Sequence, residues 1–87
     1  MPPRYRIEIK RSAAKEIRGI PRKKDRQRVV ARIEGLADDP RPPGCVKLSG
    51  RGAYRIRQGV FRIVYTVTDD KLVIEVVKVG HRRDVYR

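Results

Sequence analysis

Residues 54–67 read YRIRQGVFRIVYTV, and their pattern indicates the architecture of the whole chain. Apolar and basic residues alternate on both sides of Gln58-Gly59, which is typical of two half-buried strands joined by a two-residue hairpin loop. In that hairpin Arg55 lies directly opposite Arg62, and paired residues share one face of the sheet. The face that helices would cover carries Tyr54, Ile56, Phe61 and Ile63, and the opposite face carries Arg55, Arg57 and Arg62.

The alternation continues into a second hairpin. A tight turn at Asp69-Asp70 sets Val79 beside Val60. The segment Gly80-His81-Arg82 then leaves the sheet at the end where Arg57 lies. We therefore expect the basic strand face and the basic C-terminal segment to converge.

The N-terminal half predicts one strand and two helices. Residues 5–9 alternate as in a strand, and Ser12 is a suitable N-cap for a short helix that ends near Gly19. A second helix is expected from about Lys23 to Ala37, followed by a short strand over 45–48. The expected order is β-α-α-β-β-β-β in a single domain, 1–87. This is an α+β fold, in which a helical hairpin covers one face of a mainly antiparallel sheet of four to five strands.

The chain is strongly basic, with 23 Lys and Arg against 10 Asp and Glu in 87 residues, a net charge of +13. Such a charge attracts phosphate backbones or acidic proteins. No apolar run approaches the ~20 residues of a membrane span, and no apolar signal segment opens the chain, so we expect a cytoplasmic protein with no membrane contact. Cys45 and His81 are each alone, which excludes a disulfide framework and a Cys- or His-based metal centre, so no cofactor is expected.

The runs YRIRQGVFRIVYTVTDD at 54–70 and VGHRRDVYR at 79–87 resemble the RelE branch of the RelE/ParE toxin superfamily. RSAAKEIRGIP at 11–21, DDPRPPG at 38–44 and KLSG at 47–50 fit the same pattern, so the resemblance covers nearly the whole chain. It implies the toxin of a type II toxin–antitoxin pair. Such a toxin enters the ribosomal A site and cuts messenger RNA without a metal, by attack of a 2′-hydroxyl on the adjacent phosphate. An acidic RelB-like antitoxin would neutralise it, and operator DNA would be bound only through the toxin–antitoxin complex.

The resemblance also implies roles for individual residues. Arg55 and Arg57 stand where the family has basic residues on the third strand, and Arg62 matches the arginine that holds the scissile phosphate. Arg82 matches an arginine that acts on the leaving group or the phosphate. Tyr86 matches a tyrosine that stacks on a base, and His81 stands where relatives carry lysine or use a nearby histidine.

Arginine keeps its proton near neutral pH, so Arg55 and Arg57 cannot be general bases and are expected to stabilise developing charge on the phosphate. His81 is the one side chain whose ordinary pKa suits proton transfer, although it could equally cap the last strand. RNA or ribosome contact is expected from a further basic set, which could also be an ordinary solvated surface: Lys23, Lys24, Arg26, Arg28, Arg51 and Arg83.

Two other functions stay open. A ParE-like toxin has the same fold but poisons DNA gyrase, and it generally lacks the strand arginines together with the closing tyrosine. A non-catalytic RNA-binding module needs only positive charge and stacking aromatic residues, and it would cut nothing.

Overall fold

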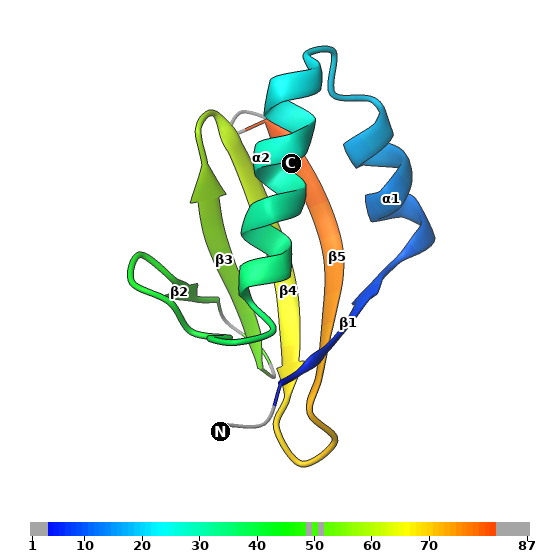
Figure 1. Ribbon diagram of the computed structural model, residues 1–87. Coiled ribbons are helices and arrows are strands. Elements are labelled where there is room, and N and C mark those ends of the chain that lie inside the picture. The colour runs from blue at the N-terminus through cyan, green and yellow to red at the C-terminus, as the bar shows by residue number, and fades with distance from the viewer. Residues whose placement is uncertain (1–3, 49, 51, 82–87) are drawn as a thin grey trace.

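The computed structural model describes residues 4–48, 50 and 52–81. Five strands form one sheet in the order β1-β5-β4-β3-β2, with β1 parallel to β5 and every other pair antiparallel. This arrangement confirms the predicted α+β fold. The elements are β1 (Arg6–Ile9), α1 (Arg11–Arg18), α2 (Lys23–Gly35), β2 (Val46–Lys47), β3 (Ala53–Gln58), β4 (Phe61–Thr68) and β5 (Val73–His81), as Figure 1 shows.

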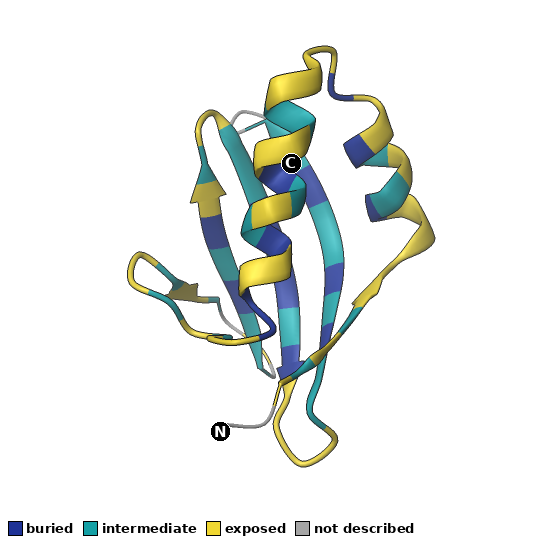
Figure 2. Cartoon of the chain, viewed as in Figure 1, coloured by how far each residue is buried: buried dark blue, intermediate teal, exposed yellow. Residues whose placement is uncertain are grey.

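Both helices lie on one face of the sheet, with α1 against β5 and α2 over β3 and β4 (Figure 1). Each helix buries two apolar residues four positions apart, Ala13 and Ile17 in α1 and Val29 and Ile33 in α2. Buried and less buried residues alternate along the central strands, as Figure 2 shows. The strand side of the core, which includes both tyrosines predicted there, consists of Tyr54, Ile56, Ile63, Tyr65, Val67, Ile74, Val76 and Val79.

The helix boundaries differ slightly from the prediction. Helix α1 begins at Arg11 with Lys10 as its N-cap and no side-chain cap, so Ser12 is not the cap. The Lys10 N–H donates to the Val76 carbonyl at 2.9 Å, and this bond to β5 places the helix start directly after β1.

Helix α2 ends at Gly35, two residues before the predicted end at Ala37. The N–H groups of Leu36 and Ala37 bond to carbonyls three residues back, which is the tighter hydrogen-bond pattern common at helix ends. Both side chains are still buried, so the apolar pattern that suggested a longer helix reflects packing of this final turn.

The β3–β4 hairpin turns one residue later than predicted, at Gly59-Val60, because Gln58 pairs with Phe61. Gly59 has a φ of 61°, and a two-residue loop that begins with such a glycine fits a type II′ turn. The observed turn shifts each pairing by two residues from the prediction, and this shift leaves every side chain on its predicted face. Arg57, and not Arg55, is therefore the residue directly opposite Arg62.

The β4–β5 loop comprises residues 69–72 and replaces the tight turn predicted at Asp69-Asp70. Within it, the Asp69 carboxylate bonds to two distant side chains: Arg41 Nη2 donates to Oδ2 at 2.8 Å, and the Tyr5 hydroxyl donates to Oδ1 at 2.6 Å. The hydrogen bonds from Arg41 and then Tyr5 lower the pKa of Asp69 to about 2. This network joins the segment before β1 and the segment after α2 to the lower end of the sheet in Figure 1.

The end of β5 also differs from the prediction. The four-residue loop moves the β4–β5 pairing by two residues from the prediction, and the irregularity at Val64/Tyr65 moves it by one more, so Val79 pairs with Ile63 and not with Val60. Gly80 and His81 stay in the strand, so the prediction that they leave the sheet is wrong. An irregular pairing of this kind admits an extra residue on one strand and cannot be counted from the turn alone.

Candidate functional site

Three arginines share the face of the sheet turned away from the helices. Arg57 of β3 pairs with Arg62 of β4, and Arg62 pairs on its other side with Gly80 of β5. Arg55 lies two residues along β3, opposite Val64. The common arginine face is confirmed, and the C-terminal strand does reach the Arg57 end, although through Gly80 within the sheet.

A hollow of about 220 Å³ lies at this end of the sheet, lined by Arg57, Gly59, Phe61 and Arg62. We call it the arginine hollow. A water molecule occupies about 30 Å³ in the liquid, so the hollow has room for an anion the size of a phosphate group. The Nε atoms of Arg55 and Arg62 are buried, whereas Arg57 is exposed. The hollow therefore combines one solvent-facing cation with one that is partly withdrawn from water.

The arginine hollow adjoins a second hollow of about 410 Å³, which we call the loop hollow. The two share Gly59 and Phe61. The first turns of α2 form the other wall of the loop hollow, where Arg22, Asp25 and Arg28 meet the β3–β4 loop. The basic surface thus extends from the sheet onto α2.

The start of α2 is electrostatically unusual. Lys23 and Lys24 are exposed in its first turn, where the helix dipole disfavours cations by typically 0.3–1 kcal/mol each. Arg28 is also exposed, as expected for a residue that contacts RNA. Arg26 is only partly exposed, and its Nη1 donates to the Ile20 carbonyl at 2.6 Å, so it holds the connection between the helices.

His81 lies on the other side of the sheet end from the arginines. It pairs with Phe61, and the two rings meet edge to face with centroids 6.2 Å apart. His81 lines a third hollow, of about 270 Å³, together with Glu16 and Lys78. Phe61 borders all three hollows and is the residue through which His81 and the arginines are connected.

Sequence reasoning missed Phe61 as a site residue and did not consider Glu16. The alternating pattern of the hairpin places Phe61 on the core face. Phe61 does pack against the core, and it also lines the hollows. Glu16 had one available signal, because it is the only acid in the otherwise basic helix RSAAKEIR. Four predicted residues lie outside the described part of the chain: Arg51, Arg82, Arg83 and Tyr86.

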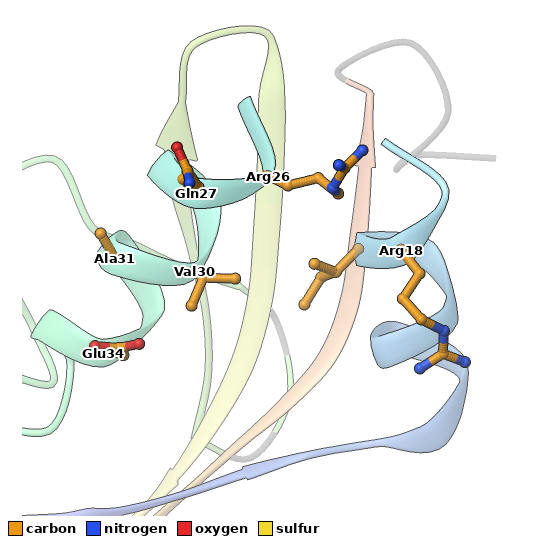
Figure 3. Close-up of a pocket in the computed structure, with 7 residues that line it drawn as sticks. Arg18, Arg26, Gln27, Val30, Ala31 and Glu34 are labelled. Atoms are coloured by element: carbon orange, nitrogen blue, oxygen red, sulfur yellow. The ribbon is translucent and has the colours of Figure 1, made fainter. Parts of the chain in front are cut away.

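A larger groove of about 590 Å³ runs between the two helices (Figure 3). Ile17 of α1 and Val30 and Ala31 of α2 supply its apolar lining, and Val30 points from α2 toward α1. Arg18 and Arg26 lie at its margin. The groove is therefore apolar inside, and its margin carries Gln27 and Glu34 as well as the two arginines.

Within the described ranges, no group of three or more His, Cys, Asp or Glu side chains is arranged to hold a metal ion. None of the helices described is long and apolar enough to cross a membrane.

The fold is similar to that of solved RelE toxins. The Pyrococcus horikoshii RelE–RelB complex includes a chain that matches with a TM-score of 0.81 and 29% identity over 93% of this chain and 98% of that one. The isolated Escherichia coli RelE toxin matches with a TM-score of 0.76 and 30% identity over 94% of this chain and 90% of that one. A curated Escherichia coli protein described as "Putative RelE-like toxin protein" is 36% identical over 88 residues, which cover 95% of this chain and 90% of the relative.

The family model described as the ParE toxin of the type II toxin–antitoxin system parDE matches residues 7–86. The chain therefore belongs to the RelE/ParE superfamily and is the toxin of a type II toxin–antitoxin system. The resemblance seen in the sequence is confirmed.

Proposed function

We propose that this toxin is a ribosome-dependent, metal-independent endoribonuclease that cuts messenger RNA in the A site and thereby inhibits translation in the cytoplasm. The arginine hollow carries this proposal, because two arginines at paired strand positions, Arg57 and Arg62, line one hollow of a size that suits an anion. The relatives described as RelE toxins agree with it.

In the proposed reaction, the 2′-oxygen of the nucleotide bonds to the adjacent phosphorus and the bond from phosphorus to the 5′-oxygen breaks. The products are a 2′,3′-cyclic phosphate and a free 5′-hydroxyl. Negative charge grows on the non-bridging oxygens in the transition state. Arg57 and Arg62 hold that charge, with Arg55 beside them, and removing one such donor typically costs about 10²–10³ in rate.

His81 is the proposed acceptor of the 2′-hydroxyl proton, a role worth roughly 10²–10⁴ in rate. Because its ring lies on the Phe61 side of the sheet end, the scissile phosphate must sit at the sheet end beside Phe61. Only there can the 2′-hydroxyl point toward His81, directly or through one water, while the phosphate oxygens point toward the arginines. Arg82, by its resemblance to the family arginine, assists departure of the 5′-oxygen, which takes its proton from water. Tyr86 stacks on a base.

The loop hollow and the start of α2 are the proposed path of the RNA backbone or of ribosomal RNA. Lys23 and Lys24 carry charge that the helix dipole disfavours, and Arg28 is exposed. Both features suit a surface that an anionic partner covers. Arg51 and Arg83 are proposed to contribute to the same surface.

The proposed neutralising partner is an acidic RelB-like antitoxin, and operator DNA would be bound only by the complex. The groove between α1 and α2 is the proposed seat of a helical segment of that antitoxin, because its lining is apolar and its margin carries two arginines, Arg18 and Arg26, against one acid, Glu34. Ala31→Glu, an exposed change in this groove, should weaken antitoxin binding and leave cleavage of messenger RNA unchanged.

A second candidate is a ParE-like poison of DNA gyrase, which the matching family model favours. The two functions are separated by one pair of assays. Purified toxin is added to ribosomes stalled on a defined messenger RNA, with ribosome-free RNA alongside, and 5′ ends are mapped by primer extension in the presence of a chelator. Supercoiling by gyrase is measured with the same preparation.

A cut within the A-site codon that needs ribosomes and no metal would support the nuclease. Gyrase inhibition without a cut would support the second candidate, and RNA binding without either effect would indicate a non-catalytic module. Arg62→Ala should lower the single-turnover rate at saturating ribosome by about 10²–10³. Lys47→Ala removes the same charge from exposed β2 and should cut normally. If Arg62→Ala cuts at the wild-type rate once bound, the role assigned to Arg62 is wrong.

A further inference from the structure

Within the described part of the chain, the last part of β5 has a neighbouring strand on one side only. β1 pairs with β5 only as far as Ile9 and Val76, and the chain then turns into α1. Residues 77–81 therefore have β4 beside them on one side and, among residues 4–48, 50 and 52–81, no strand on the other. An open strand edge leaves backbone groups that need other partners.

Glu16 of α1 occupies this open edge. Its Oε1 accepts a hydrogen bond from the Val79 N–H at 3.0 Å, and its Oε2 lies 3.5 Å from Lys78 Nζ. Val79 is only 2% exposed, so its N–H needs a partner within the protein. A hydrogen bond from a backbone N–H to a carboxylate is roughly twice as strong as one between neutral groups. Glu16 thus supplies the hydrogen-bond acceptor that a neighbouring strand would otherwise offer to the Val79 N–H.

The end of β5 that Glu16 holds also carries part of the candidate site. Gly80, one residue beyond Val79, lies beside Arg62, and His81, one residue further, packs on Phe61. Glu16 and His81 also line the same hollow. Any shift of β5 at Val79 therefore moves His81 and the strand beside Arg62 together.

Resting on the proposed nuclease function, we propose that Glu16 is a positioning residue that fixes the end of β5 and so sets His81 for catalysis. Its carboxylate does not contact the substrate. Both of its oxygens are engaged by β5, and Glu16 does not line the arginine hollow.

Four variants separate the possible roles. Glu16→Ala removes both contacts. Glu16→Gln keeps an oxygen for the Val79 N–H but loses the charge that faces Lys78. Glu16→Asp keeps the charge but is one methylene too short to reach as far. Lys78→Met removes only the ion pair. The hydrogen bond to Val79 is the important contact, so Glu16→Asp should behave as Glu16→Ala, and Glu16→Gln should behave as Lys78→Met.

The first measurement needs no ribosome. Amide hydrogen exchange at Val79 and the NMR contact between the His81 and Phe61 rings are compared for wild type and the variants, with circular dichroism as the check on folding. In Glu16→Ala and Glu16→Asp, the amide hydrogen of Val79 should exchange at least tenfold faster, and the contact between the His81 and Phe61 rings should be lost. Glu16→Gln and Lys78→Met should keep wild-type values within a few-fold.

The second measurement is single-turnover cleavage on stalled ribosomes. A misplacement of about 1 Å in a catalytic group can cost 10²-fold in rate. Glu16→Ala and Glu16→Asp should therefore lose roughly that factor in the single-turnover rate at saturating ribosome, with little change in the ribosome concentration that gives half of that rate. Glu16→Gln should restore most of the rate.

Unchanged Val79 exchange in Glu16→Ala would overturn the inference whatever the cleavage result. A loosened strand end with wild-type cleavage would also overturn it, because Glu16 would then be merely structural. If the wild-type toxin cuts no RNA, the proposed nuclease function fails and the catalytic role of Glu16 fails with it. The exchange data would still show whether Glu16 holds the strand.

Discussion

Arg57 and Arg62 face each other directly across β3 and β4, which makes a sharp prediction about stability. Like charges in such a cross-strand pair destabilise a sheet by roughly 0.2–1 kcal/mol. Arg57→Gln keeps the length of the side chain and removes one of the two charges. It should therefore raise the free energy of unfolding by about 0.2–1 kcal/mol, which for a domain of this size is roughly 1–8 °C in Tm.

The matched control is Arg55→Gln. It lies on the same strand and the same face and makes the same change in net charge, but its β4 neighbour is Val64. It should show no comparable gain. Both variants are compared with wild type by thermal and urea unfolding at about 0.1 M and 1 M salt, where the screening lengths are roughly 10 Å and 3 Å. The advantage of Arg57→Gln should shrink at the higher salt.

The same variant should cut messenger RNA more slowly, because it removes one of the two guanidinium groups in the arginine hollow. A gain in stability with a loss of activity is the behaviour expected of charges held together for an anionic substrate. If Arg57→Gln is no more stable than wild type, or if its gain is the same in 1 M salt, the reasoning from paired cations is wrong.

Two further predictions concern the fold. Asp69 has a pKa of about 2, below its ordinary 3.8, so its stabilising effect is complete above pH ~3.8 and is lost as the pH falls toward 2. Asp69→Asn should thus unfold at lower urea than wild type at pH 7, and the gap should close near pH 2; a gap that does not depend on pH would contradict this. Gly52 and Gly59 have nearly the same positive φ, 59° and 61°, but a Cβ at Gly52 would lie 2.9 Å from the Val67 carbonyl oxygen and one at Gly59 meets nothing within 4 Å. Both Ala variants should lose about 1–2 kcal/mol in urea unfolding from the backbone conformation, and Gly52→Ala should lose clearly more; equal losses would show that the contact relaxes freely.

The alternating pattern of residues 54–67 was sufficient to assign the two faces of the hairpin, even though the turn was misplaced. Side chains repeat every two residues along a strand, so a pairing shifted by two residues leaves the arginines on one face and the core on the other. The pattern could not decide whether Gly59 is the first or the second residue of the loop, since both choices preserve it. That choice determines which arginine faces Arg62.

The sequence also predicted the element order, the helix-covered face and the membership of the superfamily, because these depend on local periodicity and on motifs read along the chain. It could not place His81. The irregular pairing at Val64/Tyr65 sets the side of the sheet on which His81 lies, and no local signal marks it.

The roles of Glu16 and Arg26 were decided only by the tertiary structure. Each looks like an ordinary charged residue on a helix, yet Glu16 bonds to Val79, 63 residues away in the chain, and Arg26 bonds to the Ile20 carbonyl. A sequence determines which face of a helix or strand is apolar because that depends on near neighbours. Which backbone group a charged side chain meets depends on how separate elements pack, and that is settled only when the whole core has formed.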